Sequence, residues 1–362
     1  MGAISSLRNP RTQGADCKMI TAELSKAILN DKDCFSDVIG QDAAKYGVKS
    51  TILANRHLLI IGPAGVGKTT LAKNIAKILP PLKGIEGCAY RCTSEKPVCS
   101  TCKKNKNMKT RTIPGNERFI RIQGSPDLTV EDLIGDIDPI KALQFGPLSL
   151  EAFTPGKIFQ ANNGILFFDE LNRCPEKLQN ALLQVLQEGK ATIGSYNVDI
   201  EADFLFIATM NPDDSNTEKL STVLLDRFDV VVMSYPETLS LEKEILKHYG
   251  KKILQISEDL NDLIISFIRV LRESKDIERK PSVRATLGLY ERSQTNALLK
   301  KKKKAELEDM HDAVFSVLAH RITLKPALRY VQSPEEFLQK EFQNMMKTGM
   351  GREFREKKGD VP

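Results

Sequence analysis

The sequence lacks several features that would assign it to a specialised class. It contains no apolar run near the roughly 18 residues that a membrane-spanning helix needs, since its longest runs, at 58–61 and 165–168, have the length of buried strands. It shows no internal repeat and none of the low hydrophobicity of disordered chains, because 41% of its 362 residues are apolar and 28% are charged. Collagen, coiled-coil and mucin architectures are therefore excluded, and a soluble protein without a membrane partner is expected.

The sequence also lacks a strong excess of one charge. The 53 Lys and Arg residues against 47 Asp and Glu residues give a net charge of +6, short of the clustered positive charge of a dedicated nucleic-acid binder. Five consecutive lysines at 300–304 are interpreted as a solvated helix end or loop. The N-terminus has no apolar signal core, and seven cysteines without such a signal favour a reducing compartment, so a cytoplasmic location is expected.

Apolar and polar residues alternate in two different ways along the chain. Between residues 35 and 235, short apolar runs alternate with helical patterns, and the strand candidates are 57–61, 118–123, 165–168, 204–209 and 230–234. This alternation predicts an α/β fold with a mostly parallel sheet between layers of helices. After Pro236 only helical spacing remains, at 240–249, 260–273, 283–299 and 305–320, which predicts a smaller helical domain.

A glycine-rich segment follows the first strand candidate and precedes a helical run at 71–79. Residues 62–69 satisfy the pattern G-x-x-x-x-G-K-[ST]. In this context glycines let backbone N–H groups surround a β-phosphate, Lys68 reaches the β- and γ-oxygens, and the Thr69 hydroxyl ligates Mg²⁺. The flanking strand and helix disfavour a chance glycine-rich turn. The predicted ATP site comprises Gly62, Pro63, Ala64, Gly65, Val66, Gly67, Lys68, Thr69 and Thr70.

Polar residues follow two further strand candidates. Asp169 and Glu170 come directly after the apolar run 165–168, at the carboxyl end of a strand, where open α/β sheets bind their ligands. Asp169 is predicted to hold hydrated Mg²⁺ and Glu170 to polarise the attacking water. An acidic helix N-cap is the alternative, which so apolar a strand disfavours. Asn211 ends the next strand and would place an amide near the γ-phosphate.

These residues resemble the AAA+ ATPases, and within them the branch that contains the magnesium chelatase I subunit and the MoxR-type ATPases. The similarity covers roughly 35–299 and rests on the P-loop together with the segments SDVIGQD (36–42), TVEDLIGDID (129–138), FTPGKI (153–158), DELNRCP (169–175), NALLQVLQEG (180–189) and the hairpin at 191–200 with its turn at 194–197. It implies a P-loop AAA+ core with a parallel five-stranded sheet, followed by an all-α lid domain. The expected parts are an N-terminal extension (1–34), the core (35–238) with a cysteine-rich insert (84–112), the lid (239–345) and a flexible tail (346–362).

The resemblance also implies roles for single residues. Ile39 and Gly40 would lie over the adenine, Asn211 would be sensor 1 and Arg284 sensor 2, while the segment from 129 to 158 would project toward a ring pore. Arg227 would be the arginine finger, which stabilises charge on the γ-phosphoryl group of a neighbouring subunit's ATP. A homo-oligomeric ring, by resemblance a hexamer, is therefore expected. A surface salt bridge from Arg227 to Asp226 or Asp229 is the alternative.

Four of the cysteines lie close together between the P-loop helix and the strand candidate at 118–123. These are Cys88, Cys92, Cys99 and Cys102, in a segment rich in Lys, Gly and Pro. Four thiolates in a short segment can enclose Zn²⁺ tetrahedrally, and the spacing Cys99-x-x-Cys102 is typical of half a zinc site. Structural zinc is favoured over an iron–sulfur cluster, redox disulfides or unliganded thiols.

The function expected from these features is Mg²⁺-dependent ATP hydrolysis by a ring that remodels or activates a partner protein. A nucleic-acid motor related to replicative helicases is the alternative, because these share the pore inserts; the 34 residues before the core are too few for a typical DNA-binding domain. A nucleotide-gated scaffold without turnover is opposed by the presence of Glu170, Asn211 and Arg227. The client is not encoded, and the cysteine insert departs from the better-known chelatase I subunits, which leaves porphyrin metallation open.

Overall fold

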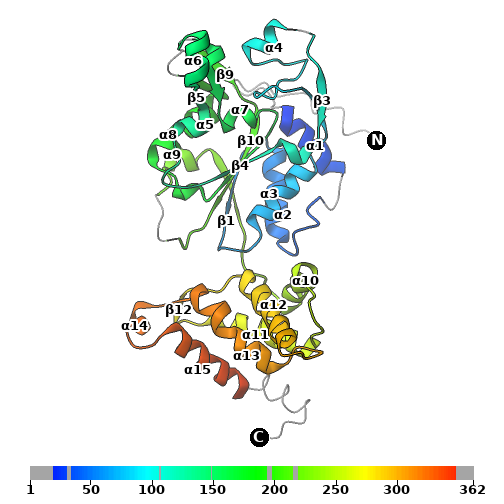
Figure 1. Cartoon of the computed structure of the whole chain (residues 1–362), viewed down its shortest axis with the longest axis vertical. Helices are drawn as coiled ribbons and strands as arrows, with labels where there is room; N and C mark the ends of the chain where they lie inside the picture. Colours follow the sequence, from blue (N-terminus) through cyan, green and yellow to red (C-terminus); the bar gives the residue numbers. More distant parts are fainter. Residues whose placement is uncertain are drawn as a thin grey trace.

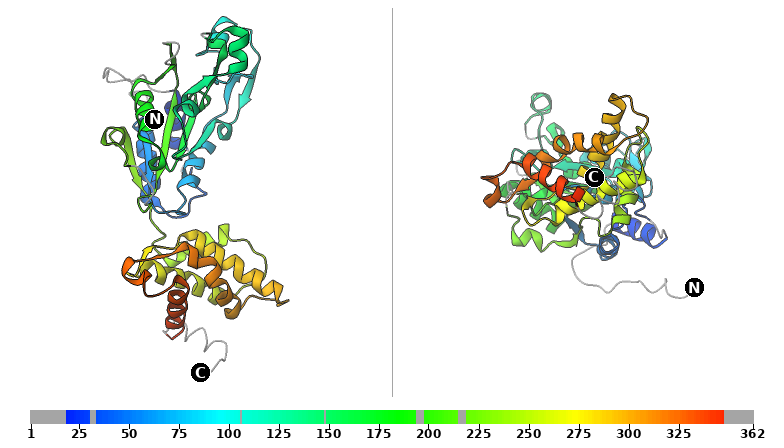
Figure 2. Two further views of the ribbon diagram at one scale, coloured as in Figure 1. Left: turned by 60° about the vertical axis from the view of Figure 1, so that its left-hand side comes forward. Right: turned by 90° about the horizontal axis from the view of Figure 1, so that it is seen from below.

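The computed structural model describes residues 19–30, 34–105, 107–147, 149–193, 198–214 and 219–347. Figure 1 shows an α/β core and a helical lid that follow one another along the long axis of the molecule. Figure 2 shows the same separation from a second direction, with the chain passing from core to lid after the last strand of the sheet. The predicted order of an α/β domain followed by a helical domain is confirmed.

The core is built on a parallel sheet with the strand order β11–β1–β10–β7–β4. Its strands are β1 (His57–Ile61), β4 (Phe119–Gln123), β7 (Gly164–Asp169), β10 (Phe204–Met210) and β11 (Phe228–Val232). All five predicted strands are confirmed, with ends displaced by at most two residues. β7 is buried along its whole length, as expected for an unbroken apolar strand covered on both faces.

Helices cover the two faces of this sheet. Ile165 and Phe167 of β7 belong to the apolar cluster on one face, and Leu166 and Phe168 to the cluster on the other, which is the two-residue period of a strand. The first face packs against α1 (Met19–Asn30), α2 (Asp42–Leu53) and α3 (Lys68–Lys77). The second packs against α5 (Val130–Ile134), α7 (Lys157–Gln160), α8 (Glu176–Glu188) and α9 (Thr222–Leu225).

Helix α1 was not predicted, and a buried arginine fastens it to the core. The Arg118 side chain is 1% exposed. Its Nη2 donates to Glu23 Oε2 of α1 at 2.7 Å, its Nη1 to the Pro80 carbonyl at 2.7 Å, and its Nε to the Asn163 carbonyl at 2.7 Å. One guanidinium thus joins α1, the segment after α3 and the loop before β7.

Three two-stranded ladders extend from the core. β2 (Leu82–Ile85) and β3 (Thr110–Ile113) frame the cysteine-rich insert, which contains α4 (Ser100–Lys104). β5 (Gly135–Ile137) and β6 (Phe153–Pro155) carry α6 (Pro139–Phe145). β8 (Lys190–Ile193) and β9 (Val198–Glu201) form the predicted hairpin, whose turn at 194–197 lies outside the described residues. Figure 1 places α4 and α6 at the end of the core that points away from the lid.

The lid is helical, with a short ladder that was not predicted. Its helices are α10 (Leu239–Tyr249), α11 (Glu258–Glu273), α12 (Val283–Leu299), α13 (Leu307–Leu318), α14 (Pro326–Arg329) and α15 (Pro334–Lys347), and its strands are β12 (Ile277–Arg279) and β13 (Thr323–Leu324). The four helices predicted here are confirmed. Lys300 and Lys302 form ion pairs with Glu308 and Asp309 of α13, which neutralises part of the lysine run.

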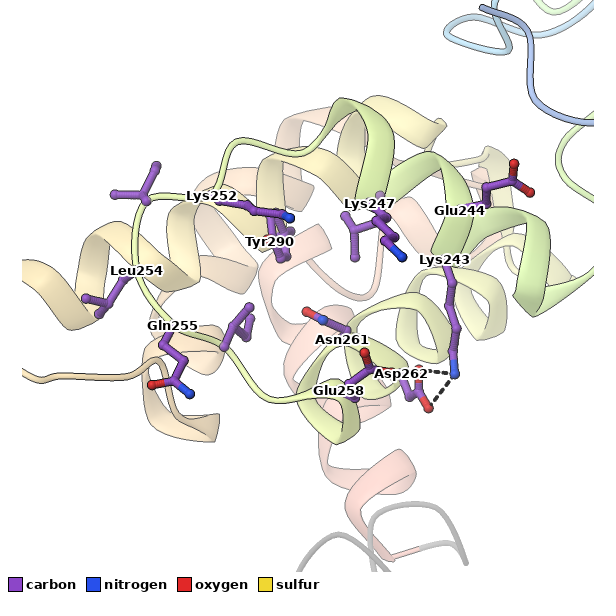
Figure 3. A pocket seen from close by; sticks show the side chains of 13 residues that line it. Lys243, Glu244, Lys247, Lys252, Leu254, Gln255, Glu258, Asn261, Asp262 and Tyr290 are labelled. Atoms are coloured by element: carbon purple, nitrogen blue, oxygen red, sulfur yellow. Dashed lines mark hydrogen bonds and ion pairs between the residues drawn. The ribbon is translucent and has the colours of Figure 1, made fainter. Parts of the chain in front are cut away.

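The lid has a hollow of about 870 Å³, and Figure 3 shows the side chains that line it. It lies between α10, the segment 251–257 and α11, with Tyr290 of α12 at its wall. An ion pair of 2.6 Å between Lys243 and Asp262 crosses one side. No P-loop residue lines this hollow, so it is separate from the predicted nucleotide site.

Candidate nucleotide site and cysteine cluster

The P-loop connects the end of β1 to the start of α3. Gly65 and Gly67 have φ angles of +75° and +100°, which residues with a Cβ rarely adopt. A Cβ on Gly62 would lie 2.3 Å from the Met233 carbonyl. The sequence folds locally as the motif predicts, with backbone N–H groups at the first turn of α3, where an anion is stabilised by unpaired N–H groups and the helix dipole.

Lys68 is the first residue of α3 and is buried. Its Nζ donates to the carbonyl oxygens of Gly62 and Pro63, at 2.5 and 2.8 Å. Burial lowers the pKa of Lys68 from its usual 10.5 to about 8, while the nearby Asp169 and Glu170 carboxylates act in the opposite direction. The ammonium group is therefore short of hydration and well placed to gain from an anionic phosphate.

Asp169, the last residue of β7, meets three side chains from three other elements. Its Oδ1 accepts a hydrogen bond of 2.7 Å from the Thr209 hydroxyl of β10. Its Oδ2 lies 3.4 Å from Thr69 Oγ1 of α3 and 2.6 Å from Arg121 Nη2 of β4. The two predicted Mg²⁺ ligands, Thr69 and Asp169, are thus adjacent, and their oxygens are the type of donor that Mg²⁺ prefers.

Glu170 is held at the sheet edge by its backbone and its carboxylate. Its φ of +59° turns the chain sharply after β7, and its N–H donates to Thr209 Oγ1 at 2.9 Å. Its Oε2 accepts from Gln123 Nε2 at 3.0 Å and lies 3.2 Å from Arg173 Nη1. The acidic N-cap alternative does not apply, because Glu170 makes no side-chain cap bond at the short helix Leu171–Arg173.

Several polar residues around Glu170 were not predicted from the sequence. Arg121 and Gln123 both lie on β4, two residues apart and therefore on one face, and Asp214 pairs with Arg173 at 2.5 Å. Arg121 and Gln123 could have been found from the sequence, because they are polar residues near the end of a strand that is otherwise mostly apolar. The role of Asp214 depended on a loop contact that the sequence does not reveal.

The segment predicted to cover the adenine lies where core and lid meet. Gly40 has a φ of +65°, and a Cβ there would be 3.2 Å from Leu241 of the lid. The Gln41 amide exchanges hydrogen bonds with the backbone of Ser234, at 2.7 and 3.4 Å. Ile39 is half-buried beside them. These contacts hold the segment against both parts of the chain.

The two predicted arginines occupy different positions. Arg284, in the first turn of α12, is near the P-loop of its own chain: its Cγ would be 3.3 Å from a Cβ on Gly65. Arg227 is exposed, and its side chain forms no hydrogen bond or ion pair with any residue that the structure describes. The salt-bridge alternative is not observed, because Asp229 pairs instead with Arg56 at 3.2 Å.

The sheet register separates Arg227 from the P-loop of its own chain. Phe228 pairs with His57 at the start of β1, whereas the P-loop begins after Ile61 at its end. Five residues of strand span about 16 Å. The Asn211 carbonyl, by contrast, accepts from Asn172 Nδ2 at 3.3 Å, so Asn211 lies on the same edge as Glu170.

The four clustered cysteines come together in the insert. All four sulfurs lie within 4.8 Å of one another, and three of the separations are 3.5, 3.7 and 3.9 Å. With zinc–sulfur bonds of about 2.3 Å, the edge of a tetrahedron is about 3.8 Å. The donor set Cys88, Cys92, Cys99 and Cys102 therefore fits a tetrahedral metal site. Burial, together with the neighbouring thiols, raises the pKa of Cys102 to about 12.

Two asparagines fix this insert on the core. Asn162 Nδ2 donates to the Tyr90 carbonyl at 2.9 Å, and Asn163 Nδ2 donates to the Arg91 carbonyl at 3.0 Å. The rings of Tyr90 and Phe159 lie 5.4 Å apart. The cysteine cluster is thereby connected to the loop that leads into β7 and Asp169.

Family models match three successive parts of the chain. "Magnesium chelatase, subunit ChlI" matches residues 34–116, "ATPase family associated with various cellular activities (AAA)" matches 100–230, and "AAA lid domain" matches 270–341. Together they cover the core and most of the lid described above. These matches show that the chain resembles AAA+ ATPases of the magnesium chelatase I subunit type. The predicted resemblance is confirmed for this AAA+ chain.

Curated proteins of similar sequence also carry names that refer to magnesium chelatase. Over 203 residues the chain is 29% identical to a magnesium-chelatase subunit ChlI homolog of Methanocaldococcus jannaschii (55% of this chain, 53% of that protein). Over 206 residues it is 31% identical to the magnesium-chelatase 38 kDa subunit of Chlorobaculum parvum (54% and 56%). The chain thus matches about half the length of these curated relatives.

Among solved structures, a complex of the BchI and BchD subunits of magnesium chelatase is similar to this AAA+ chain. The TM-score is 0.45 and the identity 20%, over 84% of this chain and 98% of that one. Within the described residues, no helix is long and apolar enough to cross a membrane.

Proposed function

We propose that the chain is a Mg²⁺-dependent ATPase that acts as a ring, by resemblance a hexamer, and uses ATP hydrolysis to remodel or activate a partner protein. One observation carries the proposal: Lys68, Thr69 and Asp169 converge at the carboxyl edge of the sheet, with 3.4 Å between Thr69 Oγ1 and Asp169 Oδ2. The named relatives are a magnesium-chelatase subunit and a homolog of such a subunit. A subunit acts with other chains, which favours a protein client over nucleic acid.

The residues of the site have complementary tasks in this proposal. Residues 62–70 would hold the phosphates, with Lys68 supplying positive charge at the β- and γ-oxygens. Mg²⁺ on Thr69 and Asp169 would neutralise developing charge on the phosphates. Glu170 would orient and deprotonate the attacking water, and Asn211 would donate an amide hydrogen bond on the γ-phosphate side.

Two arginines would complete the site from opposite directions. Arg284 lies beside the P-loop of its own chain, so we infer that it contacts the nucleotide in the same subunit. Arg227 is exposed and lies at the amino-terminal edge of the sheet, opposite the carboxyl edge from which the P-loop starts. It would therefore act on the γ-phosphate of the next subunit, which makes the ring necessary for turnover.

The cysteine insert is proposed to hold one structural Zn²⁺. Its four sulfurs are separated by distances suited to a tetrahedral thiolate site. Zinc would stabilise the folded insert, which has few apolar residues of its own, because metal binding in such small segments contributes directly to folding. An iron–sulfur cluster is the competing occupant, and elemental analysis distinguishes the two.

The test of the proposed function uses the full chain and Glu170→Gln. The wild type should release phosphate from ATP only with Mg²⁺ present. Glu170→Gln should bind ATP as tightly but turn over orders of magnitude more slowly, because the carboxylate that activates water is gone. Glu188→Gln, an exposed carboxylate on α8, is the matched control and should retain wild-type turnover.

The same variant addresses the client. Glu170→Gln held in its ATP state should retain partner proteins that the wild type releases during turnover. Wild-type turnover in Glu170→Gln would remove Glu170 from the mechanism. Retention of nucleic acid in place of protein, with salt-dependent affinity, would favour the motor alternative.

A further inference from the structure

Arg121 carries a permanent positive charge and forms an ion pair with Asp169, the carboxylate proposed to bind Mg²⁺. Its Nη2 lies 2.6 Å from Asp169 Oδ2, the same oxygen that Thr69 Oγ1 approaches at 3.4 Å. The other oxygen of Asp169 accepts from Thr209. Every oxygen of this carboxylate therefore has a protein partner, and one partner carries a full positive charge.

The geometry of β4 directs Arg121 toward this position. In the register of β4 with β7, Arg121 pairs with Phe167 and Gln123 pairs with Asp169. Arg121 is thus two residues back from the level of Asp169, and its side chain reaches along the strand to that carboxylate, also donating to Gln123 Oε1 at 3.0 Å. The Asp169 side chain is 12% exposed and that of Arg121 is 48% exposed. The carboxylate is fixed, whereas the arginine has solvent into which it can move.

We propose that Arg121 competes with Mg²⁺ for Asp169, and that the Mg²⁺-nucleotide complex binds only after this ion pair has opened. The inference rests on the proposed function, which assigns Mg²⁺ to Thr69 and Asp169. A guanidinium and a divalent cation on one carboxylate oxygen repel each other, so the two states exclude one another. The apparent Mg²⁺ affinity is then reduced by the fraction of molecules in which Asp169 is open.

The test measures binding and needs no turnover. A fluorescent ADP analogue is titrated with Mg²⁺ in the presence of the full chain, its Arg121→Met variant, and Arg121→Lys. Methionine keeps the length of the side chain without its charge, so the Mg²⁺ concentration at half-maximal binding should fall about fivefold, equivalent to about 1 kcal/mol. Arg121→Lys keeps a charge and should remain near the wild type. Binding of the analogue in EDTA should be the same in all three proteins.

Arg111→Met is the matched control. Arg111 is a half-exposed arginine that pairs with Glu117 at 3.0 Å, in the cysteine insert and away from the P-loop. Its removal should leave the Mg²⁺ dependence unchanged. Thermal unfolding followed by circular dichroism should show that Arg121→Met is folded, which its exposure predicts.

Three results would overturn the inference, and each has a different meaning. An unchanged Mg²⁺ midpoint in folded Arg121→Met would show that the ion pair does not compete. Weaker binding of the analogue both with Mg²⁺ and in EDTA would show that Arg121 binds phosphate directly. A wild-type chain that binds no nucleotide at any Mg²⁺ concentration would overturn the proposed function itself, and the competition with it.

Discussion

The Thr209 hydroxyl donates to Asp169 Oδ1 at 2.7 Å and accepts from the Glu170 N–H at 2.9 Å. A single fully buried hydroxyl on β10 thus aligns both acidic residues at the end of β7. Because β10 and β7 are neighbours in the sheet, this alignment depends on strand order as well as on the residues themselves.

Removal of this hydroxyl should damage both stability and turnover. Thr209→Val keeps the shape of the side chain but leaves a buried carboxylate oxygen and a backbone N–H without their partner, which typically costs about 1–3 kcal/mol. Urea unfolding should show this loss, and phosphate release should fall roughly tenfold or more because Asp169 and Glu170 lose their common anchor. Thr51→Val is the control, because Thr51 is also buried but its hydroxyl makes only a long hydrogen bond, of 3.4 Å, to Asp229. Wild-type stability and turnover in Thr209→Val would contradict this role.

Arg227 should act across a subunit boundary. Lys68→Ala lacks a working pocket but still offers Arg227, whereas Arg227→Ala keeps the pocket and lacks the arginine. Each variant alone should be nearly inactive, and a mixture should recover part of the hydrolysis at interfaces that combine the intact halves. Phosphate release, with co-assembly shown by light scattering, provides the measurement.

The control for this mixture is Arg56→Ala, which removes a second exposed arginine from the same edge of the sheet. It should keep most of the turnover. Demonstrated co-assembly without recovery, or full activity of dilute monomeric Arg227→Ala, would show that Arg227 does not act in trans.

Lys68 should make stability depend on pH. Its pKa is about 8 in the folded protein and near 10.5 in the unfolded chain. Between these values the unfolded state binds more protons, so the contribution of Lys68 to the free energy of unfolding rises with pH, from its least favourable value below pH 8. Lys68→Met should therefore stabilise the nucleotide-free protein at pH 7, and this gain should shrink toward pH 10. A gain that is constant across this range, measured by urea unfolding, would contradict the lowered pKa.

The cysteine cluster should contain about one metal ion per chain. Elemental analysis of protein purified without added metal should find zinc at near-stoichiometric level, and Cys92→Ser should lose it and unfold at lower temperature. Cys34→Ser, at a buried cysteine outside the cluster, should keep the metal. If neither zinc nor iron is present and all four thiols react freely in the folded protein, the site does not bind metal.

Strands and motifs were predictable because each depends on neighbours in sequence. The apolar run before Asp169, the glycine spacing before Lys68 and the helical spacing of the lid are local signals, and the structure confirms the elements that they predict. Helix α1 was missed because a short amphipathic segment without a motif resembles any solvated extension. The role of its apolar residues is visible only in the folded structure, where they pack on the sheet.

The polar shell of the site was not predictable for a different reason. Arg121 and Gln123 approach Asp169 and Glu170 because β4 lies beside β7, although 40 residues separate the two strands in sequence. The distance between Arg227 and its own P-loop likewise follows from the register of β11 with β1. Pairing of distant strands is set by the whole sheet, so no local pattern contains it.

The guanidinium of Arg118 sets the smallest piece of this chain that can fold as an ATPase core. Removal of residues 1–34, which precede the recognisable motifs, would remove Glu23. The buried guanidinium of Arg118 would then have no carboxylate partner. An uncompensated buried charge is costly enough to unfold a marginally stable domain. An excised core should therefore include α1 with Glu23, which makes the first helix part of the folded core.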